Sequence, residues 1–237
     1  MNKQLFNRLD PKDELDFQTV HFSYLNTEQL TQLETIKSES YEVIIAFSDL
    51  PESSTPIPFR YDPTIHEPYL QKFYKILDNL DRVATKIATL YIYGVPEWLP
   101  YFSVYLDSKG WQFKYWLALE TRPVENPTAP LAQAHTGILL YVKNKNKFSL
   151  RKVRSEHQHC DICGDFTADW GGKKHLRNAL GYAISDVWDD LPQVWNENYK
   201  LSKEVWQRLI MLTTEEHARI LCVAYDGEHD LEQYVFE

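Results

Sequence analysis

Two cysteines and two histidines lie close together in the sequence and are the residue types that zinc binds in proteins. Cys160 and Cys163 form a single C-x-x-C pair, with His157 three residues before it and His175 twelve residues after it. Two thiolates and two imidazoles make a common tetrahedral zinc set. The spacing therefore predicts a zinc ion held by these four residues. The alternative is a zinc-free turn with packed thiols and solvated histidines, because only one C-x-x-C pair is present.

The same part of the chain carries a strongly basic stretch. Residues 143–154 contain six Lys or Arg and no Asp or Glu, and three more basic residues follow the cysteines. Lys and Arg bind nucleic-acid phosphates by releasing counterions. Both a local nucleic-acid contact and a solvated charged loop fit this pattern. The candidate nucleic-acid-binding residues are Lys143, Lys145, Lys147, Arg151, Lys152, Arg154, Lys173, Lys174 and Arg177.

Three aspartates around Trp188 are a further candidate group, because paired carboxylates can do acid–base work or bind a metal. They are Asp186, Asp189 and Asp190. Two adjacent aspartates do not share one face of a helix. We therefore assign these residues to the surface of a helix or turn.

The overall composition limits what these residues can do. The 237 residues include 25 Lys and Arg against 34 Asp and Glu, and this net charge of −9 argues against nucleic-acid binding by bulk charge. Three cysteines are too few for a disulfide scaffold and suit a reducing compartment. The sequence contains neither an apolar run long enough to span a membrane nor a signal-peptide core at its start. We expect a cytoplasmic protein that does not bind membranes.

Hydrophobic patterns predict the elements that must position the candidate residues. Continuous apolar runs are typical of strands covered on both faces, and apolar repeats at three and four residues are typical of amphipathic helices. Pro68 suits the first residue of one such helix. The order predicts an α/β fold with a largely parallel sheet and a hairpin at its end. Strands are expected at 17–22, 43–47, 88–93, 113–119, 137–142 and 220–224, and helices at 26–36, 68–83, 96–106 and from 202.

This order of elements resembles the DNA amino-methyltransferases, which methylate adenine N6 or cytosine N4 with S-adenosylmethionine. The resemblance covers most of the chain, in the permuted order that places the catalytic half first. It implies a Rossmann-like methyltransferase sheet with a catalytic-half part at 1–143, a recognition and zinc insertion at 144–197, and a remnant of the cofactor half at 198–237. The segments that carry it are 41–51, 90–99, 113–119, 134–143, 185–192 and 201–213.

The chain departs from the family pattern at the loop that holds the target base. In the family an Asp/Ser-Pro-Pro-Tyr loop polarises the target amino group, and its aromatic ring stacks on the flipped-out base. Here the corresponding residues are Ser48, Asp49, Leu50 and Pro51. Ser48 matches the first position, but Leu50 replaces a proline and Pro51 replaces the aromatic residue. The resemblance therefore predicts a degenerate loop with no catalytic residue.

A second departure falls on the cofactor loop. The family strand that reads Val-Leu-Asp-Pro-Phe-x-Gly-Ser-Gly corresponds to residues 220–227. Cys222 replaces its acidic residue, Ala224 its aromatic residue and Asp226 its first loop glycine, before Gly227. Ten residues follow Gly227, where the family has a further helix and strand. We expect that S-adenosylmethionine does not bind to this chain alone.

Three hypotheses for the function follow. The first is a pseudo-methyltransferase subunit of a restriction–modification system, which pairs with an active homologous amino-methyltransferase as a heterodimer or homodimer and helps it hold or select DNA. The second is an active S-adenosylmethionine-dependent subunit that uses Ser48 with a divergent or partner-supplied cofactor site. The third is a stand-alone nucleic-acid-binding protein in defence against foreign DNA.

Overall fold

A computed structural model describes most of the chain. The described residues are 7–14, 16–48, 63–121, 134–160, 162–168, 171–191 and 201–224. The loop residues Asp49, Leu50, Pro51, Asp226 and Gly227 lie outside these ranges. Among the described helices, none combines the length and the apolar character that a membrane span requires.

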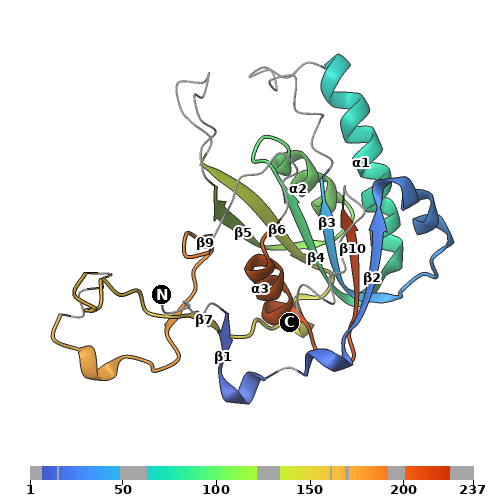
Figure 1. The fold of residues 1–237 in the computed structure, drawn as a ribbon. Helices are drawn as coiled ribbons and strands as arrows, with labels where there is room; N and C mark the ends of the chain where they lie inside the picture. The colour runs from blue at the N-terminus through green and yellow to red at the C-terminus, as the bar shows by residue number, and fades with distance from the viewer. Residues whose placement is uncertain are drawn as a thin grey trace.

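A seven-stranded sheet forms the centre of the molecule (Figure 1), in the order β2-β10-β3-β4-β6-β5-β9. The first four strands in this order run parallel to one another. β6 is antiparallel to both β4 and β5, and β9 is parallel to β5. The predicted Rossmann-like α/β class is confirmed. The strands are β2 (His21–Asn26), β3 (Tyr41–Phe47), β4 (Ala84–Gly94), β5 (Gln112–Glu120), β6 (His135–Val142), β9 (Val187–Trp188) and β10 (Arg219–Ala224).

Helices cover both faces of this sheet and bury two apolar clusters. α1 (Pro63–Val83) and α2 (Leu99–Ser108) pack on one face, where their apolar stripes meet strand residues such as Leu90 and Ile92. α3 (Lys203–Thr213) packs on the other face with residues such as Ile45 and Leu140. Because both faces are covered, the central strands are continuous apolar runs, as the sequence predicts.

Several predicted boundaries move in the structure. Pro68 lies inside α1, since the helix begins at Pro63 and continues past the proline with the loss of one backbone hydrogen bond. The strand predicted at 17–22 is displaced toward the C-terminus. Phe17–Thr19 form a 3-10 turn because the Asp16 side chain accepts a hydrogen bond from the backbone nitrogen of Gln18, and β2 begins only at His21.

A second, three-stranded sheet in the order β1-β7-β8 lies beside the main one. Its strands are β1 (Arg8–Leu9), β7 (Val153–Ser155) and β8 (Tyr182–Ala183). The chain between β7 and β8 leaves the body as an extended excursion, which is gold and orange in Figure 1. We call residues 156–181 the arm. It lies within the 144–197 segment that the sequence predicts as an insertion.

Candidate functional site

The parallel strands β10, β3 and β4 end at one edge of the main sheet. In open α/β sheets, ligands bind outside the carboxyl ends of the strands. Phe47, the last residue of β3, pairs with Tyr93 of β4, and the following residue, Ser48, donates its backbone N–H to the Tyr93 carbonyl at 2.8 Å. Gly94 ends β4 beside it. Ser48, the first residue of the predicted base loop, therefore stands at the carboxyl edge of the sheet.

The Ser48 side chain is buried there without a hydrogen bond. The residue is 3% exposed, and its Oγ has no hydrogen-bond partner among the residues that the structure describes. A buried hydroxyl that lacks a partner costs about 1–3 kcal/mol. Such groups call for an explanation, and a bound ligand is one.

Three more buried polar groups at this edge lack a hydrogen-bond partner within the described ranges. They are Nε1 of Trp98, just before α2, and Oγ1 of Thr121 and Thr136. Thr136 is opposite Leu119 where β5 ends and β6 begins, and the Thr121 N–H donates to the Ala134 carbonyl at 2.8 Å. Sequence reasoning missed all three, because a single Thr or Trp in an apolar segment carries no spacing signal.

Aromatic rings support the edge on the α3 side. The Phe47 ring lies 5.1 Å from that of Tyr93 in an edge-to-face contact and 5.4 Å from that of Trp206 in α3, measured between ring centroids. Offset and edge-to-face pairs of this kind add to packing energy. The helix that precedes β10 therefore holds the end of β3 in place.

After Arg219, the described part of β10 carries no charged side chain. Cys222 is fully buried in the middle of β10, between Ile45 of β3 and Tyr24 of β2. Burial raises the pKa of its thiol, so the group is neutral at ordinary pH. Ala224 is the last described residue of the strand. Up to that residue, β10 offers neither an acidic side chain nor a glycine-rich turn to a cofactor.

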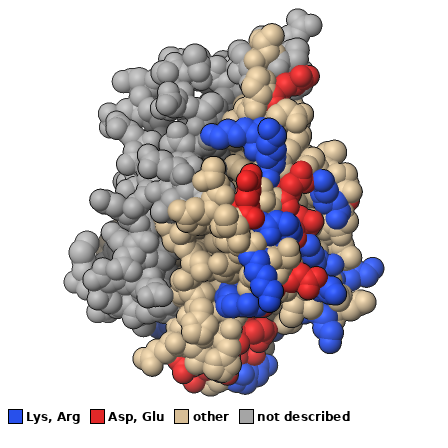
Figure 2. Space-filling view, turned by 90° about the vertical axis from the view of Figure 1, so that its right-hand side faces the viewer, with Lys and Arg blue, Asp and Glu red and all other residues tan. Residues whose placement is uncertain are grey.

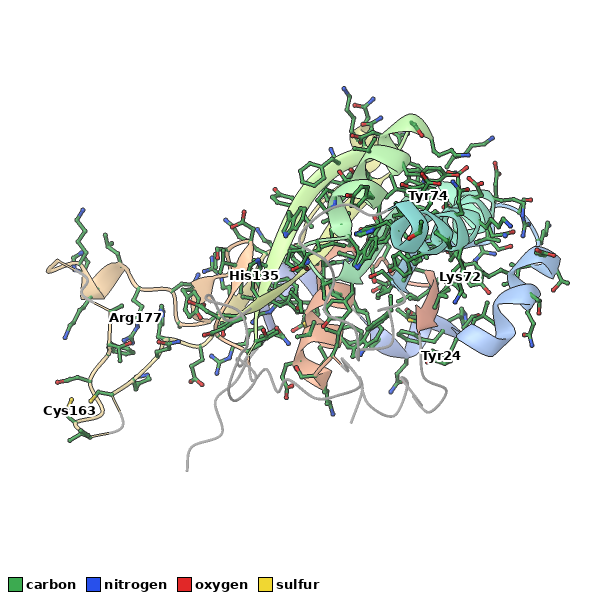
Figure 3. The ribbon with its side chains drawn as sticks, turned by 90° about the horizontal axis from the view of Figure 1, so that it is seen from above. Tyr24, Lys72, Tyr74, His135, Cys163 and Arg177 are labelled. Atoms are coloured by element: carbon green, nitrogen blue, oxygen red, sulfur yellow. The ribbon has the colours of Figure 1, made fainter. Side chains whose placement is uncertain are left out.

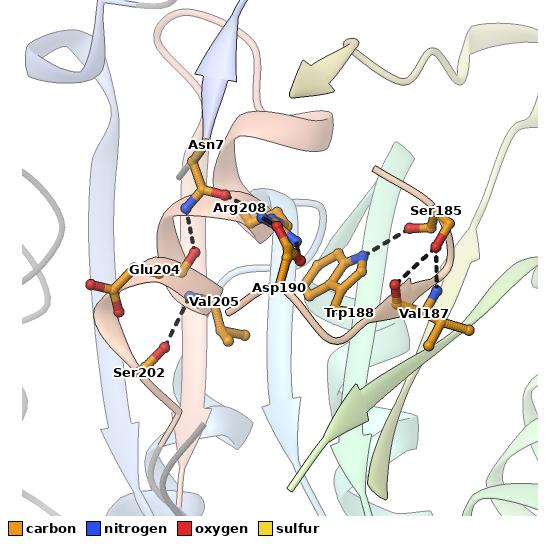
Figure 4. Close-up of polar contacts among 9 residues, drawn as sticks. All are labelled: Asn7, Ser185, Val187, Trp188, Asp190, Ser202, Glu204, Val205 and Arg208. Carbon is orange, nitrogen blue, oxygen red and sulfur yellow. Dashed lines mark hydrogen bonds and ion pairs between the residues drawn. The ribbon is translucent and has the colours of Figure 1, made fainter. Parts of the chain in front are cut away.

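A buried ion pair joins three distant parts of the chain (Figure 4). Arg208 of α3 donates from Nη1 and Nη2 to the two carboxylate oxygens of Asp190 at 2.8 and 2.7 Å. Its Nε donates to Oδ1 of Asn7 at 2.7 Å, and Nδ2 of Asn7 donates to the Glu204 carbonyl at 2.6 Å. The Trp188 ring centroid lies 5.0 Å from Cζ of Arg208. Asp190 is buried, so the expectation that it is a surface residue is wrong. The sequence does not reveal this burial because the partner of Asp190, Arg208, lies 18 residues further along the chain.

The pair also sets the ionisation of Asp190. Burial alone would raise the pKa of this carboxyl, but the hydrogen bonds and the charge of Arg208 outweigh it and hold the pKa below its usual value. Asp190 is therefore ionised at neutral pH and shields the buried guanidinium. The pair fixes the segment after β9 to α3.

The predicted zinc set is not assembled. The described residues contain no group of three His, Cys, Asp or Glu side chains that could hold a metal. Nε2 of His157 lies 3.0 Å from the Asn178 carbonyl oxygen, whereas Cys163 and His175 are exposed. Figure 3 shows Cys163 at the far end of the arm, away from the sheet. Local contacts shape the arm instead, chiefly the Arg177 guanidinium 3.9 Å over the ring of Phe166.

The structure divides the nine predicted nucleic-acid-binding residues into two groups. Four are engaged within the protein. Nζ of Lys143 lies 3.0 Å from Oδ1 of Asp81, and Arg151 forms an ion pair with Glu215. Arg154 donates a hydrogen bond to the Gly181 carbonyl. The Arg177 guanidinium lies over the Phe166 ring. The other five are exposed and make no ion pair within the described ranges: Lys145, Lys147, Lys152, Lys173 and Lys174.

The remaining charge is mixed in sign. On the face that Figure 2 shows, Lys and Arg side chains alternate with Asp and Glu side chains and form no uniform basic surface. Ion pairs such as Arg219 with Glu42 and Lys109 with Asp78 also place opposite charges side by side. A nucleic-acid contact would therefore have to be local, as the net charge of −9 predicts.

Solved structures with similar folds are methyltransferases. The PvuII DNA methyltransferase, which is cytosine-N4-specific, has a TM-score of 0.55 at 9% identity and covers 92% of this chain and 88% of its own. M1.HpyAVI has a TM-score of 0.52 at 11% identity, over 91% and 96%. A protein of Thermus thermophilus complexed with S-adenosyl-L-methionine has a TM-score of 0.50 at 11% identity, over 91% and 90%. The class is thus a Rossmann-like methyltransferase fold.

One curated relative is similar to the chain in sequence. The chain is 32% identical over 157 residues to the type II methyltransferase M.BamHI of Bacillus amyloliquefaciens. That alignment covers 62% of this chain and 36% of M.BamHI, so the chain matches about a third of its relative's length. No protein-family model matches the chain. Over the matched residues, the chain is similar to a type II DNA methyltransferase.

Proposed function

We propose that the chain is a subunit of a DNA amino-methyltransferase that supplies the target-base side of the active site. In this proposal, Ser48 at the carboxyl edge of the sheet contacts the amino group that is methylated. The arm contacts DNA. The second half of the site, which holds the methyl donor, is supplied by another polypeptide. The similarity to M.BamHI and the cytosine-N4 specificity of the PvuII DNA methyltransferase support DNA as the substrate class.

The observation that carries this proposal is the buried Ser48 hydroxyl, which has no hydrogen-bond partner in the described part of the chain. A hydroxyl oxygen placed there can accept a hydrogen bond from an exocyclic amino group of a base. That bond holds the amino nitrogen at the sheet edge and makes the nitrogen more electron-rich. S-adenosylmethionine, when bound, supplies the methyl group.

The methyl donor itself does not fit the described end of β10. Cys222 is neutral and buried, and no acidic side chain follows it as far as Ala224. We therefore assign no cofactor contact to this strand. Activity should require a partner, and the chain alone should not methylate DNA.

A methyl-transfer assay tests the proposal. The chain is combined with a homologous amino-methyltransferase chain that supplies the methyl-donor site. Incorporation of labelled methyl groups into DNA is then compared for the wild type, Ser48→Ala and Ser40→Ala. Ser40 precedes the opposite end of β3 and hydrogen-bonds its own turn, which makes it a matched control. We expect Ser48→Ala to lower the rate at least about tenfold, the loss of about 1.4 kcal/mol of transition-state stabilisation, and Ser40→Ala to leave it unchanged.

The burial of Cys222 favours a second candidate, a non-catalytic subunit that pairs with an active methyltransferase and helps it hold or select DNA. In that case Ser48→Ala leaves the rate of the complex unchanged, while omission of the chain lowers it. Titration of the chain alone with S-adenosylmethionine in a calorimeter should give no heat up to millimolar concentrations. A partner that methylates at an unchanged rate and site without this chain contradicts both candidates.

A further inference from the structure

Two glycines of the main sheet are needed for space rather than for backbone conformation. Of the seven described glycines, five have positive φ and lie in turns or loops: Gly110, Gly164, Gly171, Gly172 and Gly181. The other two, Gly94 of β4 and Gly137 of β6, lie in strands and pair directly with each other. Any residue could adopt their backbone conformation, so another constraint must require glycine there.

That constraint is the close approach of three side chains. A Cβ built on Gly94 would lie 2.3 Å from Oγ of Ser48 and 3.3 Å from Cδ2 of Leu99. A Cβ built on Gly137 would lie 2.6 Å from Cδ1 of Leu99 and 2.8 Å from Nε1 of Trp116. The two methyl groups of Leu99 thus cover the two glycines, one each. Ser48 reaches over Gly94 from one side, and Trp116 reaches over Gly137 from the other.

We propose that Gly94 is a positioning residue for Ser48, and that the missing side chain is what lets the hydroxyl lie across the end of β4. The Ser48 backbone is held by its hydrogen bond to the Tyr93 carbonyl, so rotation of the Ser48 side chain is the least costly way to make room for a methyl group at position 94. Staggered rotamers are far apart, so this rotation moves the hydroxyl to a different direction. The effect of Gly94 on the direction of the Ser48 hydroxyl does not depend on the proposed function. Its effect on catalysis rests on the proposed function.

A stability cycle tests the geometry without any assay of activity. Unfolding midpoints are measured for the wild type, Gly94→Ala, Ser48→Ala and the double variant. We expect Gly94→Ala to lower the midpoint by several degrees in the wild-type background and clearly less in the Ser48→Ala background, because that background has no Oγ at position 48. Gly137→Ala is the matched control, since its methyl meets Leu99 and Trp116 but not Ser48, and its effect should be the same in both backgrounds.

Activity of the complex tests the consequence. We expect Gly94→Ala to lower kcat about as much as Ser48→Ala does, with KM for DNA unchanged, and the double variant to be no worse than either. Gly137→Ala should leave kcat near the wild-type value. If Gly94→Ala alone does not fold, the double variant should still fold, because it lacks the clashing oxygen.

The two proposals fail in different ways. An equal loss of stability from Gly94→Ala in the wild-type and Ser48→Ala backgrounds, or a double variant that is as unfolded as Gly94→Ala, overturns the positioning role. Unchanged methylation by the complex that contains Ser48→Ala overturns the proposed function. The stability cycle still tests the positioning role of Gly94 in that case.

Discussion

The sheet and the arm hold their residues in opposite ways. At the sheet edge and at the Arg208–Asp190 pair, each functional or charged group is buried among residues distant in sequence. In the arm, Ile162 and Leu176 are 96% and 70% exposed, and short-range turns with the Arg177–Phe166 stack set the shape. Substitutions in the sheet should therefore change stability first, whereas substitutions in the arm should change binding alone.

The largest effect should come from breaking the buried ion pair. Asp190→Ala leaves the Arg208 guanidinium buried beside Trp188 and Asn7 without a counter-charge. Loss of one partner of a buried pair costs about 3–5 kcal/mol, measurable as a fall in the free energy of unfolding in urea. The adjacent Asp189 is exposed, so Asp189→Ala is the matched control and should change stability by less than about 0.5 kcal/mol. Similar losses for the two variants would contradict the role assigned to the pair.

The same ion pair should make the free energy of unfolding depend on pH in the acidic range. The Asp190 pKa is lower in the folded protein than its ordinary value of 3.8. Its contribution is therefore complete at neutral pH and is lost as the pH falls below 3.8 toward the folded pKa. The gap in unfolding free energy between the wild type and Asp190→Ala should be constant from pH 7 to about pH 5 and should narrow below about pH 4. A gap that stays constant down to about pH 2 would refute this.

A smaller effect is expected at the contact between the sheet and α3. The Tyr91 hydroxyl lies 2.9 Å from Oγ1 of Thr213 and donates to the Leu209 carbonyl at 3.2 Å. Tyr91→Phe removes these bonds and keeps the ring, so the expected loss is about 1 kcal/mol. Tyr115 is 40% exposed, and Tyr115→Phe should be neutral. Urea unfolding of both variants checks this, and equal stabilities of Tyr91→Phe and wild type would show that the contact contributes nothing.

The sequence predicts the sheet well because its signals are local. The apolar run at 43–47 is β3, and the runs at 113–119 and 137–142 fall in the antiparallel strands β5 and β6. Ser202 precedes α3 and accepts a hydrogen bond from the backbone nitrogen of Val205. Each of these elements is determined by residues that are close together in the sequence, within a single strand or a single helical turn.

The site was harder to predict because its determinants come from distant segments. Ser48 is found through the family loop, but the need for Gly94 appears only when β3 and β4 pair side by side. Asp190 is identical in type to the exposed Asp189, and only the fold brings Arg208 to it. The zinc prediction used ligand type and spacing alone, and the described arm does not bring the four side chains together.

The smallest effect on stability, and a specific effect on DNA binding, should come from the arm. Lys173 and Lys174 are exposed and make no ion pair in the described part of the chain, so replacing both with alanine should change the unfolding free energy by less than about 0.5 kcal/mol. If both contact phosphates in the complex, the slope of log affinity against log salt should fall by about 1.8.

Substitution of Lys143 tests whether DNA binding depends on the arm or on the overall positive charge. It belongs to the same predicted basic set, but its ammonium group is 3.0 Å from Oδ1 of Asp81 and lies over the Trp111 ring. Lys143→Gln should therefore leave the salt slope of DNA binding unchanged and cost some stability instead. A slope that falls by the same amount per lysine in both variants would show that the arm has no special part in binding, because charge alone would then explain the affinity.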